Sequence, residues 1–126
     1  MQRRSFLRNT GITIAGLSLL NKEILAAFLN QPAWKIKMLT GDIGIFNERG
    51  GTIGFLLTKK GIVVIDAQFP DTAPHVIEEL KKKSDKPFRY LINSHHHGDH
   101  TAGNMAFKGL VEHVVAHENS KTNQLR

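Results

Sequence analysis

The segment from Asn93 to Asn104 places four histidines and one aspartate within six residues, directly after the apolar run at residues 90–92. Imidazole and carboxylate are the usual protein ligands of a catalytic zinc ion. Packing alone gives no reason to collect such side chains at the end of a strand that is expected to be buried. The segment therefore predicts a metal site.

The spacing of these residues also predicts a geometry. In an extended chain alternate side chains point the same way, so the first and third histidines of His95–His97 share one face and the middle one faces away. Gly98 allows the chain to turn, so that Asp99 and His100 approach from a second direction at the start of a helix. This arrangement suits two neighbouring metal ions that each take part of their ligands from this segment.

The remaining pattern predicts an α/β fold. Alternating or β-branched runs indicate strands at residues 35–39, 42–46, 52–57, 62–65, 88–93 and 111–116. A helix is expected from Thr72 to Lys83, with Asp71 as its N-cap and Pro74 in its first turn, and a short helix or turn at 102–107. Strands come first and helices alternate with strands later, which favours a mixed sheet with helices packed on one side.

Residues 1–33 are interpreted as an export signal. Arg3 and Arg4 open a run that resembles the twin-arginine motif, and the apolar stretch that follows, residues 11–20, is too short to span a bilayer. We therefore expect a signal peptide at 1–33, a folded domain at 34–126, a periplasmic or otherwise exported location, and no stable membrane anchor after cleavage.

Composition narrows the chemistry. The chain has 126 residues and no cysteine, so any metal must be held by histidine and carboxylate. The formal net charge is +6, but the dense cluster Lys81–Lys83 falls at a predicted helix end, where cations complement the helix dipole. We interpret this cluster as a solvated helix end and expect no nucleic-acid partner.

The pattern His-x-His-x-Asp-His resembles the signature of the metallo-β-lactamase-fold hydrolases. The resemblance extends upstream through residues 49–54 and 61–66 and downstream through 101–104 and 114–118, and it covers the chain from Trp34 onward. It implies the N-terminal half of an αββα sandwich, incomplete because the second half and the remaining metal ligands have no match here.

By this resemblance His95 and His97 would bind a first zinc ion, and Asp99 and His100 a second. A pair of zinc ions lowers the pKa of a water between them and creates hydroxide at neutral pH, which attacks the substrate. Asp99 would also carry a proton to the leaving group, as the catalytic residue. The resemblance further implies that Asp66 supports the metal-binding loop, although a turn-initiating aspartate is an equal alternative.

Other histidines are not assigned to the site. His113 and His117 are expected at the surface or at a strand end, and His75 on a helix without a partner. The function that the resemblance implies is hydrolysis of a β-lactam, ester, thioester or related bond in a small-molecule substrate. The alternative is a truncated, non-catalytic metal-binding chain, or a subunit that needs a complementing chain. In either case the 126 residues alone are expected to be inactive, and their oligomeric state is open.

Overall fold

A computed structural model of the protein describes residues 21–125, and the chain divides into two units after Pro32. In the first unit, helix α2 spans Lys22–Leu29, and the side chain of Asn21 accepts a hydrogen bond from the backbone N–H of Glu23. No helix among the described residues is both long and apolar enough to cross a membrane. The twin-arginine motif predicted at Arg3 and Arg4 lies outside the described residues.

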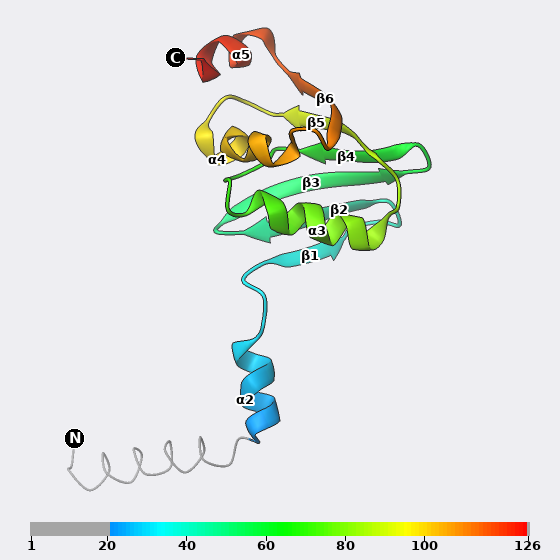
Figure 1. Ribbon diagram of the computed structural model, residues 1–126, viewed down its shortest axis with the longest axis vertical. Helices are drawn as coiled ribbons and strands as arrows, with labels where there is room; N and C mark the ends of the chain where they lie inside the picture. Colours follow the sequence, from blue (N-terminus) through cyan, green and yellow to red (C-terminus); the bar gives the residue numbers. More distant parts are fainter. Residues whose placement is uncertain (1–20, 126) are drawn as a thin grey trace, which may run out of the picture. The chain divides into compact units, whose positions relative to one another are not determined.

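The second unit is built on one six-stranded sheet whose strands follow each other in chain order (Figure 1). The strands are β1 (Lys35–Met38), β2 (Ile43–Glu48), β3 (Gly51–Thr58), β4 (Gly61–Ile65), β5 (Phe88–Asn93) and β6 (Val111–Ala116). Strands β1 to β4 pair antiparallel, whereas β4, β5 and β6 run parallel. Each predicted strand is present, with its ends shifted by no more than two residues.

Parallel neighbours need a crossover connection, which helices supply here. Helix α3 (Ala73–Lys83) joins β4 to β5, and α4 (Gly98–Thr101) with the 3-10 helix η1 (Ala102–Phe107) joins β5 to β6. The carboxyl ends of β4 and β5 therefore lie at the same edge of the sheet. This topology brings the residues after Ile65 next to the histidine-rich segment after Asn93.

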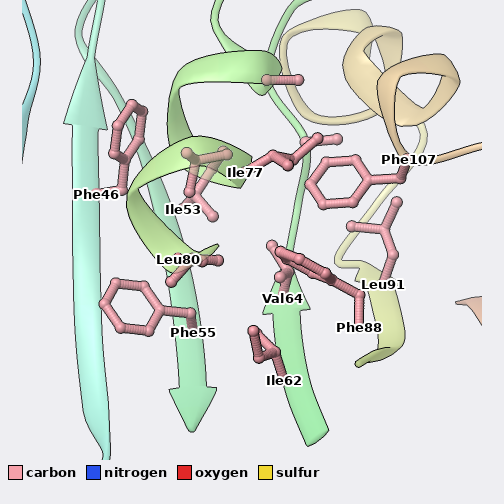
Figure 2. Packing of buried hydrophobic residues seen from close by; sticks show 13 residues of the cluster. Phe46, Ile53, Phe55, Ile62, Val64, Ile77, Leu80, Phe88, Leu91 and Phe107 are labelled. Carbon is pink, nitrogen blue, oxygen red and sulfur yellow. The ribbon is translucent and has the colours of Figure 1, made fainter. Parts of the chain in front are cut away.

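The hydrophobic core lies between one face of the sheet and the helices α3 and η1, which Figure 2 shows from close by. Its fully buried members include Phe46, Ile53, Val64, Leu91, Leu80 and Phe107. Burying a side chain of this kind stabilises the fold by about 1.5–3 kcal/mol. The core therefore provides the rigid platform from which the site residues project.

Helix α3 differs from its prediction at the N-cap. Thr72 is the cap residue, and Asp71, which the sequence suggested, pairs instead with Arg49 at 2.6 Å. Pro74 lies in the first turn, as predicted. Asp71 thus forms an ion pair with an arginine that is distant in sequence, and a sequence pattern confined to neighbouring residues cannot reveal such a pair.

The other face of the sheet stays exposed in the part of the chain between residues 33 and 125. Ile43, Ile65 and Val115 on this face are 46%, 44% and 44% exposed. The predicted α/β class, a mixed sheet with helices packed on one side, is confirmed. Helix α5 (Glu118–Gln124) was not predicted.

Candidate metal centre

The histidine-rich segment leaves the sheet at the end of β5, where its backbone is tightly held. Helix α4 begins directly after His97, whose carbonyl oxygen accepts hydrogen bonds from the N–H groups of His100 and Thr101 at 3.0 and 3.1 Å. The buried Thr101 also donates its hydroxyl to the carbonyl oxygens of His96 and His97. The turn at Gly98 therefore brings the second half of the motif back toward the first half.

This turn gathers the imidazole rings. The ring of His95 lies 4.0 Å from that of His100 and 4.8 Å from that of His97, measured between centroids. The ring of His96 lies 4.8 Å from His97. Three of the predicted ligands, His95, His97 and His100, are thus neighbours in space.

Asp66 lies at the centre of the hydrogen bonds that support these rings. It follows β4 in a left-handed backbone conformation, with φ of 69°, and is only 6% exposed. One carboxylate oxygen accepts the backbone N–H of Ser94 at 2.8 Å, and the other accepts the Ser94 hydroxyl at 2.7 Å and Nδ1 of His100 at 2.8 Å. A single buried carboxylate therefore connects β4 to both ends of the turn.

Ser94 extends this network to His95 and was missed by the sequence analysis. Its hydroxyl oxygen lies 2.9 Å from Nδ1 of His95. Since the hydroxyl donates to Asp66, its oxygen is left to accept the Nδ1–H of His95. A hydroxyl residue directly before the first histidine, together with an aspartate at a parallel strand end, is the sequence signal that could have revealed it.

The same network occupies one ring nitrogen of two histidines. His95 and His100 both use Nδ1 in this network, which leaves Nε2 as the ring nitrogen of each that could bind a metal ion. Carboxylate support of this kind orients imidazole ligands and raises their basicity in metal sites. The donor chemistry therefore fits zinc.

The donor atoms suit zinc, but their positions in this conformation do not form a complete set of ligands. Oδ2 of Asp99 lies 3.3 Å from Nε2 of His100, so two predicted ligands contact each other. Within residues 21–125, no three histidine or carboxylate side chains are placed closely enough to hold a metal ion. Binding of a zinc ion at this position would therefore require the side chains of these two residues to move.

The histidines outside the motif lie apart from this network. His113 stacks on Tyr90, and His117 caps α5 by accepting the N–H of Asn119. The prediction that His75 has no partner is wrong. Nδ1 of His75 lies 2.8 Å from a carboxylate oxygen of the buried Glu48, an acid that the chain supplies from β2.

Glycine at position 103 allows the turn to pack against the end of β4. Its N–H donates to the carbonyl oxygen of Gln68 at 2.9 Å, and the N–H of Ala67 donates to that of His100 at 2.8 Å. A Cβ at Gly103 would collide with the backbone carbonyl of Ala67. The residue must be glycine for the segment at 66–68 to approach this closely.

A cavity of about 680 Å³ lies away from the site, at the other end of the sheet, between the β3–β4 turn and the lysine-rich end of α3. There Lys82 bonds Glu79 at 2.9 Å and lowers the pKa of that carboxyl. This ion pairing agrees with the interpretation of Lys81–Lys83 as the solvated end of a helix.

Comparison with known proteins identifies the fold. The sequence model of the Metallo-beta-lactamase superfamily matches residues 46–125. A subclass B3 metallo-beta-lactamase, MEM-A1, from a soil metagenome library superposes with a TM-score of 0.62 and 21% identity, covering 70% of this chain and 34% of its own. The Cronobacter sakazakii metallo-beta-lactamase with a HARLDQ motif superposes with a TM-score of 0.63 and 18% identity, and the match covers 82% of this chain and 38% of that enzyme.

A third neighbour carries metal in its crystal form. FIM-1 from Pseudomonas aeruginosa, a metallo-beta-lactamase solved in a mono-zinc form, superposes with a TM-score of 0.62 and 16% identity, covering 75% of this chain and 46% of its own. The chain thus spans between a third and a half of the length of these relatives. The matched sequence region includes the whole histidine-rich turn, and the chain belongs to the metallo-β-lactamase superfamily.

Proposed function

We propose that this chain carries the metal-binding segment of a zinc-dependent hydrolase. His95 and His97 would hold one zinc ion, and Asp99 and His100 a second. The observation that carries the proposal is the hydrogen-bond network of Asp66, because it occupies Nδ1 of two neighbouring histidines and so leaves Nε2 of each, with Asp99 beside that of His100, as the atoms that would face a metal ion. Membership of the metallo-β-lactamase superfamily supports the same assignment.

The chemistry follows from these residues. When bound, a zinc pair supplies a water acidic enough to act as nucleophile near neutral pH and polarises the scissile bond. Asp66 holds the imidazole of His100 directly and that of His95 through Ser94, so that little reorganisation accompanies the reaction. Asp99, whose side chain is 59% exposed, is the residue that we assign to carry a proton to the leaving group.

The proposed substrate is a small molecule with a β-lactam, ester, thioester or related bond. The solved relatives described above are each 21% identical to this chain or less, and likeness at this level shows the fold alone. It leaves the type of bond open. The proposal is therefore a reaction class, attack of an activated water on a carbonyl or related centre.

One observation favours a second candidate. Within residues 21–125 no three donors are placed to hold a metal ion, which would suit a chain that binds zinc weakly and is not catalytic by itself. Such a chain would act as a non-catalytic metal-binding fragment or as a subunit completed by a partner chain that supplies the missing ligands. The two candidates share the metal site and differ in turnover.

Metal analysis tests the proposed site. The full chain is loaded with zinc, dialysed and compared with the double variant His95→Ala/His97→Ala, with His113→Ala/His117→Ala as a control that also removes two histidines. We expect the unaltered chain and the control to retain zinc and the His95/His97 variant to lose it. Equal zinc retention by all three proteins would refute the assignment.

A further inference from the structure

The tip of the β2–β3 hairpin forms a wall beside the proposed metal ligands. Residues 49–52 line one side of a cavity of about 200 Å³, and Phe69, Asp99 and His100 line the other. The cavity is therefore bordered by two of the proposed metal ligands, Asp99 and His100. A substrate group that lies beside the reacting bond would be placed to enter it.

Backbone conformation sets this region apart. Among the described residues, the non-glycine residues with positive φ are Arg49 at 49°, Asp66 at 69° and Gln68 at 52°. All three lie in the hairpin tip or in the segment facing it. Such conformations are disfavoured for residues with a Cβ and are retained where surrounding structure holds them, often at ligand sites.

Two neighbouring side chains fasten the hairpin tip. The carboxylate of Glu48, which is 7% exposed, bonds Nδ1 of His75 at 2.8 Å. Nη1 of Arg49 contacts both carboxylate oxygens of Asp71, at 2.8 and 2.6 Å, and its guanidinium lies 4.5 Å from the ring centre of Phe69. The wall is thus held in position before any ligand arrives, which reduces the entropy lost on binding.

Close packing behind the tip adds to this rigidity. A Cβ at Gly51 would lie 2.7 Å from Nε2 of Gln68, whose buried amide has no hydrogen-bond partner among the protein atoms described. The absence of a side chain at Gly51 therefore lets the tip rest on the Gln68 side chain. A larger residue at position 51 would require the Gln68 amide to move.

Arg49 keeps donors available for a ligand. Its hydrogen bonds to Asp71 use Nη1 alone, so Nε and Nη2 make no protein hydrogen bond among those described. The side chains of Arg49 and Asp71 are 53% and 66% exposed, so water screens their attraction and a competing anion can share the guanidinium. The planar fork of arginine donors matches the two oxygens of a carboxylate.

We propose that Arg49 is a specificity-determining residue that binds a carboxylate group of the substrate in this cavity, an inference that rests on the proposed function. Asp99 on the opposite wall repels an anion while its charge is uncompensated, and a bound cation reverses that local charge. Carboxylate binding should therefore depend on zinc. The preferred substrates are amides or esters that carry a carboxylate close to the reacting bond.

A matched pair of probes tests the proposal on the full chain loaded with zinc. N-benzoylglycine carries a carboxylate, and N-benzoylglycinamide is its uncharged counterpart. Calorimetry gives both dissociation constants, and the NMR shifts of the Gly50 and Gly51 amides report the place of binding. We expect the unaltered chain to prefer the carboxylate about tenfold, the gain typical of a charge-assisted hydrogen bond.

Two variants should move this preference in opposite directions. Arg49→Gln should remove the preference, and Asp71→Asn, which frees the guanidinium, should increase it. Arg89→Gln is the control, because Arg89 is an arginine of β5 that pairs with Glu112 away from the cavity. The opposite shift for Asp71→Asn keeps the test decisive even if Arg49→Gln folds poorly.

Zinc content measured in each sample separates a failure of the proposed function from a failure of the inference about Arg49. If the unaltered chain retains zinc but shows no preference for the carboxylate, or if Arg49→Gln keeps the preference, this inference is wrong and the proposed function stands. If the unaltered chain does not retain zinc, the proposed function fails and this inference fails with it. The expected outcome is zinc retention in all variants, with the preference changing only in those at Arg49 and Asp71.

Discussion

One carboxylate oxygen of Asp66 lies 2.8 Å from Nδ1 of His100, although 34 positions separate the two residues. The contact exists because β4 and β5 are parallel neighbours, so the residues that follow the two strands meet at one edge of the sheet. The imidazole is thereby oriented by the fold itself. This relationship makes a local side-chain arrangement depend on strand pairing, and it leads to the first prediction.

Replacing Asp66 by asparagine should weaken zinc binding about 10–100-fold, the usual effect of removing the partner that orients a ligand. The loss follows because a neutral amide at this position would no longer compel Nδ1–H in both His95 and His100. Zinc affinity is measured by competition with a coloured chelator. Asp85→Asn, a surface variant, is the control, and equal affinities in the two variants would contradict the prediction.

Gly103→Ala should destabilise the fold by roughly 2–3 kcal/mol, because the new Cβ would press on the backbone of Ala67, which has little room to move. Gly98→Ala is the matched control, since nothing lies within 4 Å of a Cβ built there. Urea unfolding of both variants measures the difference. Similar free energies of unfolding for the two variants would show that the segment at 66–68 can retreat.

The 126-residue chain by itself should show little or no hydrolysis of β-lactams, thioesters or phosphodiesters. Among residues 21–125 no three ligands are placed to position the attacking water, and positioning accounts for much of metal catalysis. Turnover is measured with and without chelator. A partner segment that supplies further histidine and carboxylate ligands should restore activity, and Asp99→Asn should then abolish most of it. Chelator-sensitive turnover by the chain without such a partner would overturn this expectation.

Export is tested with residues 1–33 fused to a folded reporter. We expect the reporter to reach the periplasm by the twin-arginine route, and Arg3→Lys/Arg4→Lys to block it, because lysine keeps the charge but lacks the planar guanidinium donors of arginine. Fractionation of the cells followed by an assay of the reporter gives the result. Equal export of the lysine variant would mean that the segment has another role.

The sequence pattern predicted the strands well because each is a short alternating or β-branched run, as for Ile62–Ile65 before Asp66. It also indicates which residues could coordinate metal, since their chemistry is local, and that assignment stays a prediction. It failed for Ser94, for His75 and for the cap of α3. In each case the deciding partner comes from another strand or loop: Asp66 for Ser94, Glu48 for His75, and Arg49 for Asp71.

The exposed face of the sheet has a consequence for how the protein behaves in solution. Large apolar side chains such as Ile65 and Val115 stand in water there, beside the edge strand β6, whose outer backbone groups have no strand neighbour in the sheet formed by the described residues. Surfaces of this kind promote association and aggregation. The apparent thermal stability of the chain should therefore vary with its concentration. A dilution series of melting curves would show how far association contributes to the stability of this fold.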